Sequence, residues 1–161
     1  MQSRLLVPSD HAFYAELYSD HAIMRHIGTP LTAELAERSF RQALKHNAAT
    51  DWQRLFYVIE DKARFRLGLL GFTQDADDET AIELGILLCK EAQGKGLSTS
   101  TIKAGIEKVF ETSIFQKVRL EVHRENMAAV AMAQSIARKF YSEQTINNNQ
   151  FCFNYQPLTS D

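Results

Sequence analysis

The sequence has few residues that cross-link a chain or interrupt its regular structure. Its 161 residues include three prolines and two cysteines, Cys89 and Cys152. The cysteines lie far apart and form neither a CxxC pair nor a Cys/His spacing that would bind a metal ion. We therefore expect two buried free thiols in a reducing compartment, although two cysteines could also form one disulfide. No metal is expected.

The sequence also lacks a long apolar run and an excess of charge of either sign. Its longest apolar stretch, Ile82 to Cys89, is interrupted by Glu83 and Gly85, and a membrane span needs ~18 apolar residues. No targeting segment is visible near the N-terminus. The formal net charge is -2, which gives no reason to expect nucleic acid or an anionic membrane as partner. We expect a soluble cytoplasmic protein.

The order of the segments predicts a layered fold in one domain over residues 1–161. No internal repeat, low-complexity tract or Pro/Gly-rich linker divides the chain. Strands are expected at 4–7, 55–60, 65–73, 81–89, 117–122 and 151–155, and helices at 10–19, 20–27, 32–46, 99–110 and 126–140. Helices mixed among strands in this way indicate an α/β (α+β) fold.

Particular residues are expected to cap, pack or bend these segments. Ser9 or Asp10 can cap the first helix and Thr32 a later one. Gly68 and Gly71 indicate a bulge or a close backbone approach within a strand. The side chains expected to face inward from the N-terminal helices are those of Phe13, Tyr14, Leu17, Leu35, Phe40 and Leu44.

The most informative segment is 83–98, in which a buried strand leads through a glycine-bearing loop directly into a helix. The first backbone N–H groups of a helix lack intrahelical partners and lie at the positive end of its dipole. Gly94 and Gly96 leave no side chain between those N–H groups and a phosphate. The segment therefore predicts a phosphate-binding loop.

Two common phosphate-loop patterns fit this segment poorly. The Walker A pattern requires Ser or Thr after its lysine, whereas Lys95 is followed by Gly96. The dinucleotide pattern GxGxxG requires a glycine where Thr99 stands, and it belongs to the first strand–helix turn of its domain. Here the loop lies past the middle of the chain.

A third pattern fits better. Residues 93–98, Gln-Gly-Lys-Gly-Leu-Ser, resemble the (Gln/Arg)-x-x-Gly-x-(Gly/Ala) signature of the GNAT superfamily of CoA-dependent N-acetyltransferases, with Ser98 at the last position. The resemblance extends over nearly the whole chain and is greatest to the branch that acetylates ribosomal-protein N-termini. It implies a mixed, mostly antiparallel central sheet with helices on both faces. The strands at 82–88 and 117–122 would splay apart in a V and admit the pantetheine arm of CoA.

The resemblance implies a set of residues that bind acetyl-CoA. Backbone groups of Ile86, Leu87 and Leu88 would pair with pantetheine, and one N–H would polarise the thioester carbonyl. Asn126 would contact the CoA arm, although helix capping alone also explains an asparagine there. Lys95 either contacts a phosphate or is a solvated lysine. The residues that would surround the pyrophosphate are Gln93, Gly94, Lys95, Gly96, Leu97, Ser98 and Thr99.

The resemblance also implies a general base and a proton donor. Glu83 either draws a proton from the substrate ammonium or is a strand-edge glutamate paired with a surface cation. The tyrosine that many relatives use as acid is replaced by Ala133, and the Gly-Phe that usually ends this helix by Ala137-Arg138. His123 and Tyr141 are the alternative proton donors. Their simpler roles are a strand-end histidine and a packed tyrosine.

These observations predict direct acetyl transfer from acetyl-CoA to a primary amine, with a protein N-terminus, an amino acid or a small amine as acceptor. A covalent route through Cys89 is not expected, because no His/Asp partner is evident in sequence. The alternative is a non-catalytic acyl-CoA-binding sensor. The acidic run at 75–79 is either a solvated turn or an acidic lip that attracts a cationic amine. The resemblance also implies a homodimer as one oligomeric state of the chain.

Overall fold

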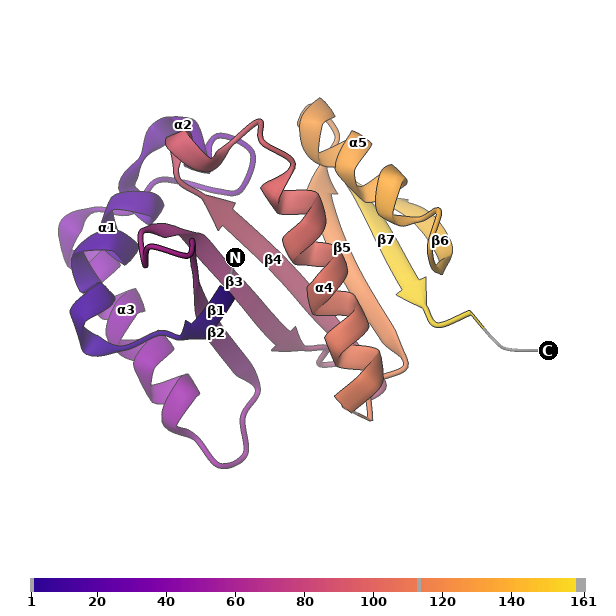
Figure 1. Cartoon of the computed structure of the whole chain (residues 1–161), viewed down its shortest axis with the longest axis horizontal. Helices are drawn as coiled ribbons and strands as arrows, with labels where there is room; N and C mark the ends of the chain where they lie inside the picture. The colour runs from indigo at the N-terminus through magenta and orange to yellow at the C-terminus, as the bar shows by residue number, and fades with distance from the viewer. Residues whose placement is uncertain (1, 113, 159–161) are drawn as a thin grey trace. The chain divides into compact units, whose positions relative to one another are not determined.

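A computed structural model describes residues 2–112 and 114–158 as strands mixed with helices (Figure 1). The sheet has seven strands in the order β1-β2-β3-β4-β5-β7-β6. Antiparallel pairs include β1–β2, β5–β7 and β6–β7, and β4–β5 is parallel. The predicted mixed α/β fold with a mostly antiparallel sheet is confirmed. In chain order the elements are β1 (Gln2–Leu5), α1 (His11–Ser19), α2 (His21–Met24), α3 (Ala33–Ala48), β2 (Arg54–Glu60), β3 (Arg66–Gln74), β4 (Ala81–Leu88), α4 (Leu97–Thr112), β5 (Lys117–His123), α5 (Met127–Ile136), β6 (Tyr141–Asn147) and β7 (Gln150–Gln156).

The contacts within the chain define two compact units. The first comprises the residues up to Phe72 together with Ile86–Gly94, and the second comprises Thr73–Gly85 and the residues from Lys95 onward. Strands β3 and β4 each contribute residues to both units. None of the described helices is long and apolar enough to cross a membrane.

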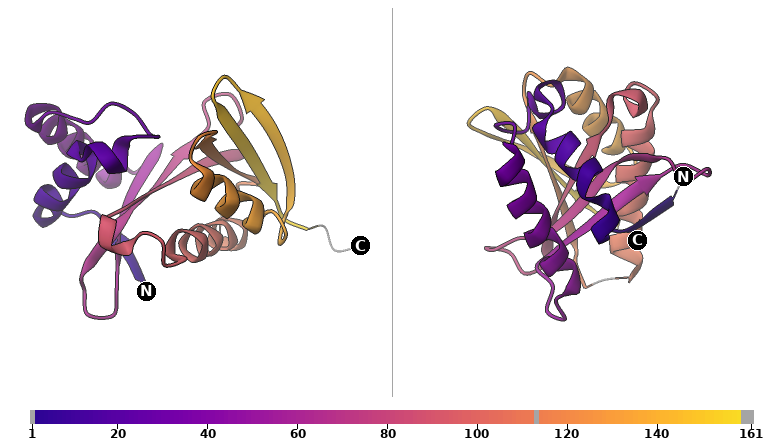
Figure 2. Two further views of the ribbon diagram at one scale, coloured as in Figure 1. Left: turned by 90° about the horizontal axis from the view of Figure 1, so that it is seen from above. Right: turned by 90° about the vertical axis from the view of Figure 1, so that its left-hand side faces the viewer.

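In the first unit, helix α3 packs against α1 and β2 (Figure 2). Tyr14, Leu17 and Phe40 are buried as predicted. The prediction for Leu35 is wrong, because its side chain is 46% exposed. The buried face of α3 passes through Ala36, Phe40 and Ala43, at spacings of four and three residues, and Leu35 lies about 100° away from that face.

Two helices of the first unit are capped by side-chain oxygens that accept hydrogen bonds from backbone N–H groups. The hydroxyl of Thr32 accepts a hydrogen bond from the N–H of Leu35, as predicted for α3. Asp20 accepts from the N–H groups of Ala22 and Ile23 at the start of α2. The predicted cap of α1 is wrong in its detail, since Asp10 occupies the N-cap position but makes no side-chain cap bond. Its carboxylate instead binds arginines.

In the second unit, α5 packs against α4 and β5. The alternating residues Val118, Leu120 and Val122 of β5 are all buried, as the strand pattern predicts. On β7, the rings of Phe153 and Tyr155 stack with centroids 6.3 Å apart. The hydroxyl of Tyr155 donates a hydrogen bond of 2.8 Å to the carbonyl oxygen of Ala133, which ties β7 to α5.

The C-terminal part of the second unit differs from the sequence prediction. Helix α5 ends at Ile136 rather than near residue 140, and strand β6 was not predicted. Strand β6 pairs with β7 through a tight turn in which Asn148 has a φ of 48°. It is the terminal strand of the sheet and is exposed on both faces, so its sequence has no apolar alternation to reveal it.

Candidate active site

The glycine-bearing loop has the backbone geometry that the sequence predicts for a phosphate site. Gly94 and Gly96 have φ values of 72° and 71°, in the left-handed region that other residues rarely adopt. A Cβ atom built at either position would meet nothing within 4 Å. The first helical hydrogen bond of α4 runs from the N–H of Ser100 to the carbonyl of Gly96. The loop therefore presents open space next to the first N–H groups of a helix.

Gln93 links this loop to the preceding strand. Its side-chain amide donates a hydrogen bond of 3.0 Å to the carbonyl oxygen of Leu88, and its backbone N–H donates to Lys90. Lys95 is exposed. The half-buried residues at the start of α4 are Leu97, Ser98 and Thr99. The first residue of the signature thus has a structural role of its own, which is to hold the loop against the end of β4.

Strand β4 combines buried apolar residues with a carboxylate that faces water. Leu87 and Leu88 are buried, Ile86 is half-buried and Glu83 is exposed. The parallel pairing with β5 covers three positions, ending at Glu83 opposite Arg119, whereas β4 itself continues to Leu88. Glu83 therefore lies on a face of β4 that is open to water.

A glycine on β3 fixes the position of the end of β4. A Cβ atom on Gly68 would lie 2.2 Å from the carbonyl oxygen of Leu87 and 2.7 Å from a methyl carbon of Leu88. The predicted close backbone approach is thus confirmed at Gly68. Of the two alternatives predicted for Gly71, a bulge or a close approach, the close approach does not occur, because a Cβ there would make only an ordinary contact of 3.9 Å with Phe56.

An ion pair joins the residues after β4 to helix α2. The ammonium group of Lys90 contacts the carboxylate of Asp20, which also caps α2. The hydrogen bond that Lys90 donates to Asp20 lowers the pKa of Asp20 and raises the pKa of Lys90. Sequence reasoning missed this pair, because the two residues are far apart in the chain and opposite charges alone do not identify a contact.

The turn between β5 and α5 carries two of the predicted site residues. The side-chain oxygen of Asn126 accepts a hydrogen bond of 3.2 Å from the N–H of Ala129, which is the expected helix cap. The Nδ1 atom of His123 accepts one of 3.3 Å from the N–H of Glu125. With Nδ1 as acceptor the ring carries its hydrogen on Nε2, so Nε2 can donate a hydrogen bond.

A cavity of about 640 Å³ opens beside this turn within the second unit. The guanidinium carbon of Arg124 lies 5.6 Å from the centre of the Phe151 ring, and the backbone N–H of Arg124 donates to the carbonyl of Asn149. Arg124 was not among the predicted site residues. The lining residues are His123, Arg124, Glu125, Met127, Val130, Gln134, Asn149 and Phe151.

The sequence profile of the family described as Acetyltransferase (GNAT) domain matches residues 3–137. The chain belongs to this family. As a GNAT-family member it is an acyl-CoA-dependent acetyltransferase, which is the enzyme class that the sequence predicted.

Solved structures share the fold of this GNAT chain at low sequence identity. A spermidine N-acetyltransferase from Vibrio cholerae in complex with CoA and spermine is 22% identical, with a TM-score of 0.76 and coverage of 95% of this chain and 92% of that one. A domain from Methanocaldococcus jannaschii is 14% identical, with a TM-score of 0.75 and coverage of 96% and 97%. A comparison with curated proteins gave no match.

The remaining candidate proton donor of this GNAT chain lies at the surface. Tyr141 begins β6, is 52% exposed, and its hydroxyl donates to the carboxylate of Glu143. The simpler expectation of a packed tyrosine is therefore wrong. Ala133 is fully buried in α5, and its carbonyl oxygen is held by Tyr155.

The acidic run and the cysteines also have defined environments. Asp75 contacts Arg119, and Asp78 forms an ion pair of 2.7 Å with Lys117, whose hydrogen bond lowers the pKa of Asp78 to about 2. Two of the carboxylates in the run are therefore compensated by cations of β5. Both cysteines are free thiols, as expected, but only Cys152 is buried. Cys89 is half-buried, and this burial raises the pKa of its thiol.

Proposed function

We propose that this chain transfers the acetyl group of acetyl-CoA directly to a primary amine. The main support is the loop at 93–99, where two glycines in the left-handed region precede a helix of 16 residues and leave open space beside its N-terminus. Backbone N–H groups in that position suit a pyrophosphate, because they are unsatisfied donors at the positive end of the helix dipole.

The proposed cofactor contacts extend from the loop to the neighbouring segments. Backbone groups of Ile86, Leu87 and Leu88 would pair with pantetheine as an added strand, and Gly68 supports this role by fixing the end of β4. Asn126 would contact the CoA arm with the amide N–H₂ group, since its oxygen caps α5. Lys95 is exposed at the tip of the loop, where it can reach a phosphate.

The proposed chemistry requires a neutral amine and a departing thiolate. Glu83, which faces water from a mostly buried strand, would take the ammonium proton directly or through a water molecule. His123 would donate a hydrogen bond from Nε2 to the departing thiolate sulfur, since Nδ1 accepts from Glu125, and the thiolate would take up its proton from solvent. Attack by the amine itself is favoured over a Cys89 intermediate, because the raised pKa of that thiol leaves little thiolate near neutral pH.

The proposal specifies the acceptor only as a primary amine. The solved V. cholerae relative is a spermidine N-acetyltransferase, whereas the closest resemblance noted in the sequence is to enzymes that modify protein N-termini. The carboxylates of Asp75 and Asp78 are already paired with cations, which weakens the case for an acidic lip that attracts a polyamine.

A turnover screen tests the proposed transfer. The protein would be incubated with acetyl-CoA and a panel of amino acids, peptides with free N-termini and polyamines, with CoA thiol release and acetylated product both measured. Loss of a general base typically costs about 10²–10⁴-fold in rate. Glu83→Gln should therefore lower kcat by about a hundredfold or more, while Glu79→Gln, an exposed carboxylate of the acidic turn, should not.

Two results would contradict the proposal. Equal rates for wild type and Glu83→Gln would remove Glu83 as the base. Tight acetyl-CoA binding without turnover of any amine in the panel would instead favour the non-catalytic acyl-CoA sensor, for which the buried Ala133 in place of the usual tyrosine is the supporting observation.

A further inference from the structure

The cavity beside the β5–α5 turn is lined by apolar side chains and by charged side chains of both signs. Met127, Val130 and Phe151 supply apolar surface, and Arg124 and Glu125 bring a cation and a carboxylate into the same lining. Its volume of about 640 Å³ lies within the ~300–1,000 Å³ that is usual for small-molecule sites. One member of the lining, His123, is a residue to which the proposed transfer already gives a role.

Arg124 is held in place but not neutralised. Its backbone is fixed by the hydrogen bond to Asn149, and its guanidinium lies over the ring of Phe151. Within the part of the chain that the structure describes, no carboxylate lies within 4.0 Å of this guanidinium. Arg119 on the preceding strand, by contrast, contacts Asp75. Arg124 therefore offers an oriented fork of donors to an anion from outside.

We propose that this cavity binds the acceptor, and that the acceptor is a small zwitterion of the amino-acid type. Its carboxylate would be held by Arg124 in a bidentate contact, and its apolar side chain would lie against Met127, Val130 and Phe151. The carboxylate of Glu125 would attract the ammonium group of the same acceptor. This inference rests on the proposed acetyl transfer and narrows the acceptor class.

The charge pattern disfavours an acceptor that carries only positive charge. The guanidinium of Arg124 repels a polycation, and Glu125 is the acidic residue of the lining that reduces this repulsion. A simple apolar amine would bring no counter-charge for Arg124. A zwitterion satisfies both charged residues at once.

The test compares matched acceptors that differ only in the carboxylate. L-leucine and L-leucinamide share the amine and the side chain, and 1,4-diaminobutane represents a polycation. Removing one partner of a charged hydrogen bond costs about ten- to a hundredfold in affinity. Arg124→Gln should raise the KM for leucine by about that factor, change the KM for leucinamide less than about twofold, and leave the Kd for acetyl-CoA unchanged.

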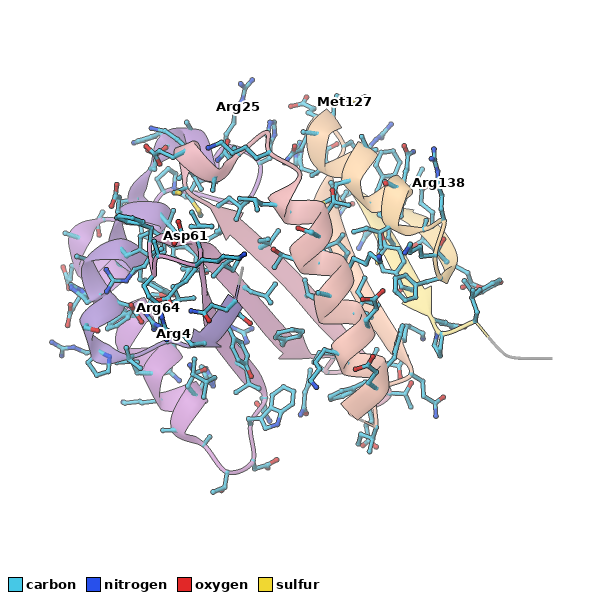
Figure 3. All side chains as sticks on the ribbon, viewed as in Figure 1. Arg4, Arg25, Asp61, Arg64, Met127 and Arg138 are labelled. Atoms are coloured by element: carbon cyan, nitrogen blue, oxygen red, sulfur yellow. The ribbon has the colours of Figure 1, made fainter. Side chains whose placement is uncertain are left out.

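Arg138→Gln is the matched control. Arg138 is exposed and lies beyond the opposite end of α5 from Met127 (Figure 3), and it does not line the cavity. This variant should leave all of these constants unchanged. Equal effects of Arg124→Gln on leucine and leucinamide, or no effect on either, would overturn the inference while leaving acetyl transfer intact.

Two further outcomes separate this inference from the proposed function. If Arg124→Gln weakens binding of acetyl-CoA but not of its 3′-dephospho form, the guanidinium holds a cofactor phosphate and the inference is wrong. If wild type binds acetyl-CoA but acetylates no amine, the transfer proposal fails. Calorimetric titration of leucine and leucinamide into CoA-saturated protein then tests whether the cavity binds a carboxylate. Tighter binding of leucine that Arg124→Gln abolishes supports the carboxylate site, and equal binding of the two ligands overturns it.

Discussion

At the scale of single residues, Gly68 shows how one missing side chain shapes the predicted cofactor strand. The carbonyl oxygen of Leu87 occupies the space that a Cβ atom would need, at 2.2 Å. Because this neighbour is backbone, it cannot move aside by rotating a side chain, and β3 and β4 would have to separate. The end of β4, where pantetheine is proposed to pair, would shift with it.

Gly68→Ala should therefore lower the free energy of unfolding by about 3 kcal/mol, the cost of overpacking a close contact. Gly71→Ala on the same strand is the control, because its Cβ would make an ordinary contact of 3.9 Å, and its effect should stay within about 1 kcal/mol. Urea denaturation of the three proteins gives these values. Similar losses for both variants would contradict the assigned role of Gly68.

Cys89 provides a residue-scale test of direct transfer. Burial raises the pKa of its thiol, so the nucleophilic thiolate is scarce near neutral pH. We expect Cys89→Ser to keep kcat within about twofold, whereas loss of a true nucleophile would nearly abolish the reaction. Steady-state kinetics measures the effect. Loss of activity, together with an acetylated wild-type protein in the mass spectrum, would indicate a covalent intermediate.

At the scale of elements, helix α5 depends on Asn126, which is both a cap and a proposed cofactor ligand. The variants Asn126→Ala and Asn126→Asp separate these roles, since aspartate keeps the capping oxygen but loses the amide N–H₂. Asn126→Ala should lower stability by about 1 kcal/mol, and Asn126→Asp should not. Both should weaken acetyl-CoA binding in calorimetry. Unchanged affinity in both variants would leave Asn126 as a cap only.

The elements that sequence reasoning found are those with a clear apolar period. Strand β5 and helix α4 bury their residues at the expected spacings, two for the strand and three to four for the helix. The end of α5 and the whole of β6 were missed. Strand β6 is almost entirely exposed, so its position is set by pairing with β7 and not by burial of its own side chains.

At the scale of the whole molecule, a network of ion pairs holds the β1–β3 part of the first unit. Asp10 has no exposed surface, and its carboxylate accepts hydrogen bonds from Arg4, Arg66 and the N–H of Val7. Arg4 also binds Glu60. Arg64, which lies near Arg4 in Figure 3, binds Glu60 as well. Burial alone would raise the pKa of Asp10, but the hydrogen bonds from Arg4, Val7 and Arg66 and the charge of Arg4 outweigh it, and the pKa falls below 3.8.

This network predicts a specific dependence of stability on pH. A carboxyl group whose pKa is lower in the folded state stabilises the fold above its unfolded pKa of about 4, and that contribution is lost as the pH falls through the folded value. Asp10→Asn should lower the free energy of unfolding at pH 7 by about 3 kcal/mol, because it leaves Arg66 without its charge partner and Arg4 with Glu60 alone. Thermal melts from pH 7 to pH 3 test this. A variant as stable as wild type at pH 7 would contradict it.

The candidate site was predictable where it depends on local backbone chemistry. The loop at 93–99 and the cap at Asn126 follow from residues that are close together in sequence. The Lys90–Asp20 pair and the cavity around Arg124 were not predictable in this way, because they depend on side chains that only the folded chain brings together. Single-sequence reasoning has no signal for such long-range contacts.

The most direct test of the account is calorimetric titration of acetyl-CoA into wild type, Gly96→Ala and Gly96→Glu. Both variants place a side chain at a φ of 71°, and they share that backbone strain, but only the glutamate adds negative charge beside the proposed pyrophosphate site. We predict binding in the micromolar range for wild type, weaker binding for Gly96→Ala and none for Gly96→Glu. No binding by wild type, or equal binding by Gly96→Glu and Gly96→Ala, would contradict the assignment of this loop to acetyl-CoA.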